Sequence, residues 1–135
     1  MRQSSRLFFL ALLLLLGGCA SFSPPPRPQD FPFHSTDDPI FHLYWRLDRR
    51  EGAVTATGLV EAASGRRGDF CAVYLHLRGL DKEGRVVSHG LGRTLPGELD
   101  PFQTIPFTVT LRPTGPEDRF ELSVWSYDLE TGQGC

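Results

Sequence analysis

Four histidines are the side chains of this sequence best suited to acid–base catalysis or metal binding, but each lies in a different segment. They are His34, His42, His76 and His89, and none has the short spacing that zinc ligands require. A catalytic centre would have to bring His76, His89 and Asp81 together in one cleft. We therefore expect no enzyme activity, no catalytic residue, no metal site and no cofactor.

The first of three cysteines, Cys19, follows a segment with the composition of an export signal. Arg2 and Arg6 give a positive start, and residues 7–16 contain no charged or polar side chain. A positive start, a short apolar run and small residues before the cut are typical of a secretory signal peptide. The apolar run is too short to cross a membrane, because a spanning helix needs about 20 residues.

The sequence Leu16-Gly17-Gly18-Cys19 resembles the bacterial lipobox, a leucine and two small residues before an invariant cysteine. The resemblance implies cleavage between Gly18 and Cys19, diacylglycerol on the Cys19 sulfur and fatty acylation of the new amino terminus. Ala20 takes the place of the aspartate that favours inner-membrane retention, so an outer-membrane anchor facing the periplasm is expected. The alternative is an ordinary signal peptide followed by a chance cysteine.

A proline-rich segment follows the anchor. It contains Pro24, Pro25, Pro26, Pro28, Pro32 and Pro39, which exclude a helix and are expected to prevent a strand ladder. We predict three parts: a signal peptide at 1–18, the lipidated cysteine and an extended tether at 19–39, and a domain at 40–135. A proline-rich docking peptide is the alternative to a plain spacer. Phe31 and Phe33 either dock on the domain or touch the membrane.

The charge of the mature chain argues against nucleic acid as a partner. Loss of Arg2 and Arg6 leaves 12 basic side chains against 16 acidic ones. Nucleic-acid binding favours a basic patch, and an anionic lipid surface likewise attracts polybasic segments. The lipid on Cys19 is therefore the expected contact with the membrane.

Residues 40–135 have the pattern of an all-β domain. Apolar and polar residues alternate with period two, which is typical of half-buried antiparallel strands. The strands are predicted at Ile40–Asp48, Val54–Ala62, Phe70–Leu80, Gly84–Leu95, Phe102–Arg112 and Arg119–Asp128. Turns are predicted at Asp81–Gly84 and Leu95–Glu98. We expect a single antiparallel, immunoglobulin-like β-sandwich of about six to seven strands.

The strand from Val73, the Asp81-Lys82-Glu83-Gly84 turn and the following Val86-Val87 resemble the central hairpin of FxLyD-type domains. The later motifs Leu95-Pro96-Gly97-Glu98 and Phe107-Thr108-Val109 extend the resemblance. It implies an immunoglobulin- or fibronectin-like sandwich of bacterial envelope proteins without catalytic residues. The naming motif departs from the family, since Leu77, Gly79 and Leu80 replace Phe, Leu and Tyr.

If Cys19 carries lipid, Cys71 and Cys135 remain as an even pair in an oxidising compartment. The last strand of such a sandwich often runs antiparallel beside the Cys71 strand. Its end would then lie near Cys71, and Gly132 and Gly134 give the tail slack. We predict a Cys71–Cys135 disulfide; two free thiols are the alternative.

The leading functional prediction is a non-catalytic envelope module that binds another protein or contributes to envelope assembly. An exposed aromatic face built from Trp45, Trp125, Tyr74 and Tyr127 would serve such binding, but such residues are more often core residues or cross-strand pairs. The alternative is a small-ligand carrier or sensor, which needs a cleft between the sheets with convergent polar groups.

Overall fold

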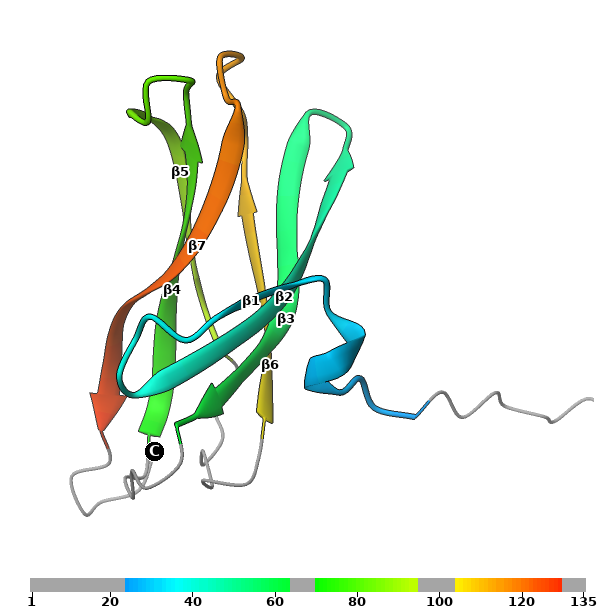
Figure 1. Cartoon of the computed structure of the whole chain (residues 1–135), viewed down its shortest axis with the longest axis vertical. Coiled ribbons are helices and arrows are strands. Elements are labelled where there is room, and N and C mark those ends of the chain that lie inside the picture. Colours follow the sequence, from blue (N-terminus) through cyan, green and yellow to red (C-terminus); the bar gives the residue numbers. More distant parts are fainter. Residues whose placement is uncertain (1–23, 64–69, 95–103, 130–135) are drawn as a thin grey trace, which may run out of the picture.

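The computed structural model of the chain describes residues 24–63, 70–94 and 104–129. These residues form seven strands and one short 3-10 helix, Pro28–Asp30 (Figure 1). The strands are β1 (Phe33–Ser35), β2 (Phe41–Arg50), β3 (Ala53–Ala62), β4 (Phe70–Leu80), β5 (Val86–Arg93), β6 (Thr104–Leu111) and β7 (Arg119–Leu129). No helix within the described ranges has the length and apolar character needed to cross a membrane.

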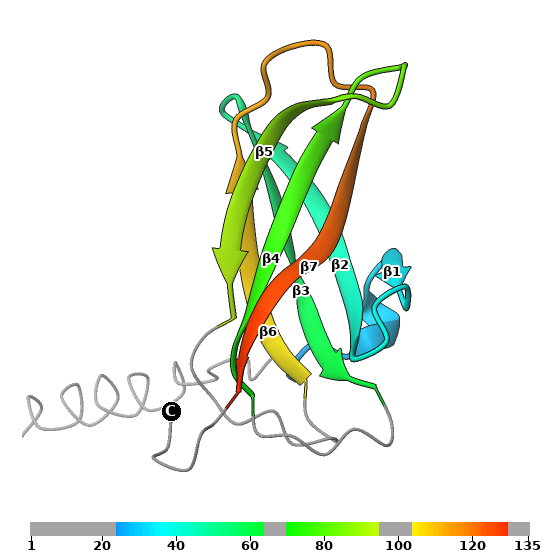
Figure 2. The ribbon, with the colours of Figure 1, turned by 90° about the vertical axis from the view of Figure 1, so that its left-hand side faces the viewer.

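The strands form two packed antiparallel sheets. Sheet A has the order β1-β2-β3-β6, and sheet B has the order β5-β4-β7 (Figure 2). The chain passes between sheets after β3, after β5 and after β6. The predicted all-β antiparallel sandwich is therefore confirmed, and each of the six predicted strands is present with its ends moved by a few residues at most.

The seventh strand, β1, lies in the segment predicted to be a tether. The prediction that its prolines prevent strand pairing is wrong for Phe33–Ser35, which pair with Leu43–Trp45 of β2. Pro32 and Pro39 lie outside these three residues, and an edge strand tolerates neighbouring prolines. Phe33 stacks on Trp45 with ring centroids 5.9 Å apart, and the Arg46 guanidinium lies 5.0 Å from the Phe31 ring. Both phenylalanines thus dock on the domain.

The core lies between the sheets and is built from the inward side of each strand. Its fully buried members include Phe41, Leu43, Val60, Leu75 and Leu77. Burial of each such side chain stabilises the fold by about 1.5–3 kcal/mol. This alternation of buried and exposed residues holds both sheets together and fixes which side chains face solvent.

Two glycines in β5 serve close packing between the sheets. A Cβ atom on Gly92 would lie 2.6 Å from Cγ2 of Val109 in β6, and one on Gly90 would collide with the carbonyl oxygen of Thr110. The sequence suggests a bulge or twist at these glycines. The register shift of this ladder lies instead between Gly79 and Leu80, so close approach explains Gly90 and Gly92.

The predicted Asp81–Gly84 turn connects β4 and β5. The Gly84 amide donates to the Asp81 carbonyl oxygen at 3.0 Å, and Gly84 has a φ of 81°. The buried Asp81 carboxylate accepts hydrogen bonds from the amides of Arg85 and Glu83, at 2.9 and 3.0 Å, and forms an ion pair with Arg85. The hydrogen bond from the Arg85 amide is the largest of the interactions that lower the pKa of Asp81. The second predicted turn, Leu95–Glu98, lies outside the described residues.

The link between β6 and β7 is organised by Glu117. Its carboxylate accepts hydrogen bonds from the backbone amides of Thr114 and Gly115, at 2.6 and 2.8 Å. Burial alone would raise the pKa of Glu117, but the Ser88 hydroxyl and these amides together lower it from 4.5 to about 2. The charged form is therefore favoured by folding.

Glu117→Gln is expected to lower the melting temperature at neutral pH. Because the folded-state pKa is depressed, the stability supplied by this carboxylate is present above pH 4.5 and disappears as the pH falls through about 2. The difference in melting temperature between wild type and variant, measured by thermal unfolding, should shrink over that pH range. Glu51→Gln, at an exposed position, is the control and should change little. A gap that stays constant down to pH 2 would refute the role of Glu117.

Candidate functional site

The last strand of the domain, β7, has a hydrogen-bonded neighbour on one side only. It pairs with β4 from Phe70↔Leu129 to Leu80↔Arg119, and within the described ranges no strand pairs with its other edge. Beyond that edge lie β2 and β1 of sheet A (Figure 2). An edge strand presents a row of unpaired N–H and C=O groups, so this side of the sandwich is open to pairing.

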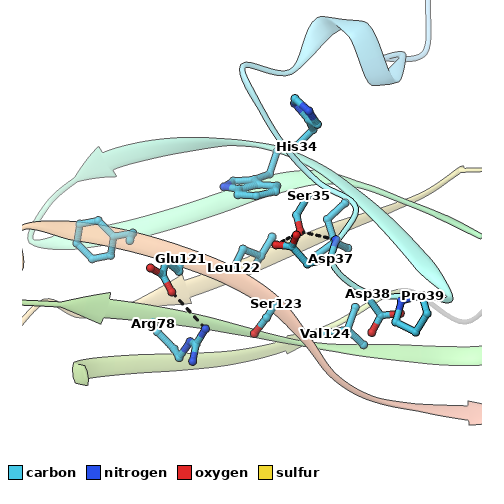
Figure 3. Close-up of a pocket in the computed structure, with 13 residues that line it drawn as sticks. His34, Ser35, Asp37, Asp38, Pro39, Arg78, Glu121, Leu122, Ser123 and Val124 are labelled. Atoms are coloured by element: carbon cyan, nitrogen blue, oxygen red, sulfur yellow. Dashed lines mark hydrogen bonds and ion pairs between the residues drawn. The ribbon is translucent and has the colours of Figure 1, made fainter. Parts of the chain in front are cut away.

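A cleft of about 580 Å³ runs along the free edge of β7 (Figure 3). One wall is β7 from Phe120 to Val124, together with Arg78 of the adjacent strand. The other wall consists of Leu43 and Trp45 of β2 and of the segment that contains β1 and leads into β2. That segment contributes His34, Ser35, Asp37, Asp38 and Pro39. We call this space the β7 cleft.

Acidic groups predominate around the β7 cleft. Glu121 forms an ion pair with Arg78 at 3.3 Å. Asp38 accepts hydrogen bonds from the amides of Ile40 and Phe41 at 2.8 and 3.0 Å, and Asp37 accepts one from the Ser35 hydroxyl at 3.1 Å. Among the residues that the structure describes, neither aspartate has a cationic partner. The cleft therefore carries excess negative charge on its β1 side.

The outer face of sheet B carries an exposed group of aromatic and apolar side chains that crosses its three strands from β7 to β5. Trp125 of β7 is 64% exposed and Leu91 of β5 is 61% exposed. His76 of β4 lies between them, with its ring 5.1 Å from Trp125, at 90°, and 5.7 Å from His89. We call Trp125, His76, His89 and Leu91 the Trp125 patch.

Electrostatics keep the imidazole at the centre of the Trp125 patch neutral near neutral pH. Partial burial is the main cause that lowers the pKa of His76, and the charges of Arg78 and His89 act in the same direction. A neutral imidazole between Trp125 and Leu91 is easier to desolvate than a charged one. The patch is therefore suited to contact with another surface.

The predicted aromatic face is only partly present. Trp125 and Tyr74 lie on the outer face of sheet B, where the Tyr74 hydroxyl donates to Asp128 at 2.8 Å. Trp45 is buried in the core instead. Tyr127 packs edge-on against Phe41 at 5.5 Å. The four aromatic residues therefore do not share one exposed face, and Trp45 and Tyr127 follow the alternative that such residues belong to the core or pack against it.

The four histidines of the described residues lie on both sheets, and two of them are neighbours. His76 and His89 are neighbours, but Asp81 is held in the β4–β5 turn by Arg85. His42 lies on sheet A, 3.8 Å from Glu61. Across the described part of the chain, no three His, Cys, Asp or Glu side chains gather as metal ligands would.

The cysteine predictions fall largely on residues outside the described ranges, which include Gly18, Cys19 and Cys135. Cys71, at the start of β4, is disulfide-bonded. The pairing of Phe70 with Leu129 places the end of β7 beside the start of β4, as the predicted topology requires. Within one chain the partner is Cys19 or Cys135, so the pairing with Cys135 stays a prediction.

The β1 side of the cleft could not be recognised from the sequence, because the prolines around residues 34–39 predict a tether there. The signal for docking was present in Phe31 and Phe33, whose rings lie on β2 residues. Comparison with protein-family models, curated proteins and solved structures gives no match. The resemblance to FxLyD-type domains therefore rests on its motifs alone, whereas the two-sheet antiparallel fold is established.

Proposed function

We propose that this protein is a lipid-anchored lipoprotein of the bacterial envelope that binds another envelope protein without catalysing a reaction. Lipid on Cys19 would hold the chain on a membrane. The favoured location is the outer membrane, on the side that faces the periplasm. The β7 side of the sandwich would contact the partner. Supporting this assignment are the lipobox-like sequence at Leu16–Cys19 and the features of β7.

The observation that carries the proposal is the position of Trp125 on the free edge strand. Trp125 is 64% exposed, and tryptophan is enriched among residues that dominate binding energy. The unpaired edge and the β7 cleft adjoin it on the same strand. Exposed apolar surface next to a structured groove is typical of protein-interaction sites.

The polar groups of the β7 cleft favour a protein over a small polar ligand. Arg78 and Glu121 pair with each other, and Asp38 is bound by backbone amides. A small-molecule site needs convergent polar groups that are free to bind the ligand. Here the Arg78–Glu121 pair and one oxygen of Asp38 are engaged within the domain, so the carrier or sensor alternative has weaker support.

Photo-crosslinking in the membrane-anchored protein tests this proposal. A photoreactive amino acid at position 125 should give one dominant protein adduct, identified by mass spectrometry, whereas the same group at the exposed position 48 should not. Trp125→Ala should then weaken binding of that partner by about 2 kcal/mol, or roughly 30-fold in Kd. Equal adducts at both positions, or unchanged affinity of the alanine variant, would contradict it.

A further inference from the structure

The free edge of β7 is regular over only part of its length. Residues 120–124 pair one-to-one with residues 75–79 of β4, but the register then shifts and Trp125 has no opposite residue. A bulge of this kind bends a strand and ends regular pairing. An incoming strand would thus find a straight edge next to Phe120–Val124, which is also the part of β7 that lines the cleft.

The side chains of this straight segment alternate in a way that suits strand addition. Phe120, Leu122 and Val124 belong to the core or pack against it, while Leu43 and Trp45 form the opposite wall of the cleft. Side chains of a strand point alternately to its two faces. A strand paired with β7 would therefore direct every second side chain into the cleft, between β7 and β2.

The charge on the β1 side of the cleft defines the other side chains of the occupant. Asp37 and Asp38 lie on the rim without cationic partners in the described part of the chain, whereas Glu121 on the β7 side contacts both Arg78 and Arg119. Opposite charge across an interface favours the right partner and like charge disfavours the wrong one. A second copy of this acidic chain would bring further carboxylates, including those of Glu121 and Asp128 on its own β7.

We propose, building on the function above, that β7 accepts an extended, basic segment of the partner protein as a fourth strand of sheet B. The segment carries apolar residues at every second position, which enter the β7 cleft, and lysine or arginine that meets Asp37 and Asp38. Backbone hydrogen bonds to β7 supply affinity, and the cleft supplies selectivity. Antiparallel pairing with β7 is expected because it is the commoner and slightly more stable arrangement.

The test uses the full lipidated chain in detergent micelles and the peptide acetyl-Val-Lys-Val-Lys-Val-Lys-Val-amide as the probe. Binding should slow amide hydrogen exchange in residues 119–124 by about tenfold or more. Two matched peptides separate the causes. Glutamate in place of lysine should weaken binding by about tenfold or more through charge, and N-methylation of alternate amides should abolish it by removing backbone donors.

Two substitutions on the protein side complete the test. Asp37→Lys on the exposed rim should weaken binding of the lysine peptide at least about fivefold. Asp48→Lys makes the same charge change away from the cleft and should leave this binding unchanged. Val124→Lys should also weaken binding, and its unfolding curve shows whether the domain remains folded. Equal binding of the N-methylated or glutamate peptide, or protection of β7 by self-association without peptide, would overturn the proposal.

The outcomes also separate this inference from the proposed function. If the protein crosslinked at position 125 binds Asp37→Lys and Val124→Lys as well as wild type, strand addition is refuted while protein binding stands. If no adduct forms at position 125 but the lysine peptide still protects β7, the edge accepts a strand and the assigned envelope function fails.

Discussion

Replacing Cys19 with serine is expected to abolish lipidation almost completely and to leave unprocessed or mislocalised precursor. A serine hydroxyl cannot replace the thiol to which diacylglycerol would be attached. Each buried methylene of an acyl chain contributes about 0.8 kcal/mol, so the loss of several chains removes the anchor. Fractionation of cells should move the variant out of the lipidated membrane pool, and mass spectrometry should find unprocessed precursor.

Ser21→Ala, two residues away, is the matched control for this anchor prediction and should remain lipidated and membrane-bound. The substitution tests the lipobox directly, because Cys19 is the residue that the lipobox resemblance assigns to lipid attachment. Normal membrane retention of the Cys19→Ser variant would rule out the lipoprotein assignment, and with it the favoured location.

The second large effect is expected from Cys71→Ser. A bond between Cys71 and Cys135 closes a loop of about 64 residues, and the loop-entropy model gives about 4 kcal/mol of stabilisation. Cys71→Ser and Cys135→Ser should therefore each lower the free energy of unfolding by about this amount, and the double variant should lose little more. Denaturant unfolding under non-reducing conditions measures the change.

The Cys19→Ser variant separates the two possible partners of Cys71. It should keep the disulfide and the full stability of the domain, and each single substitution at 71 or 135 should expose one new thiol to alkylation. If Cys19→Ser frees the Cys71 thiol, or Cys135→Ser leaves it oxidised within one chain, the predicted pairing is wrong.

The strands could be predicted because their chemistry repeats locally. In β2 the alternation places Phe41, Leu43 and Trp45 on one face, and all three are buried. The alternation within β7 places Trp125 on the outer face of sheet B, as predicted. Asp81 and Gly84 define their turn through a side-chain cap and a positive φ. In each case a few neighbouring residues determine the outcome.

The cleft and β1 could not be predicted in this way. β1 has three residues, too few to show a period, and its place depends on Phe33 stacking on Trp45. The walls of the cleft come from residues as distant in sequence as Asp37 and Leu122. Only the packing of the two sheets brings them together, and no local pattern records that.

The docking of β1 has a mechanical consequence. If lipid on Cys19 anchors the chain, tension between membrane and domain would first load the contact of Phe31 with Arg46. It would then load the pairs Phe33↔Trp45, His34↔Tyr44 and Ser35↔Leu43. A strand of three pairs peels one pair at a time. Its detachment would carry His34 and Ser35 away from the cleft that they line. In an anchored chain, such tension would therefore change the shape of the proposed binding surface.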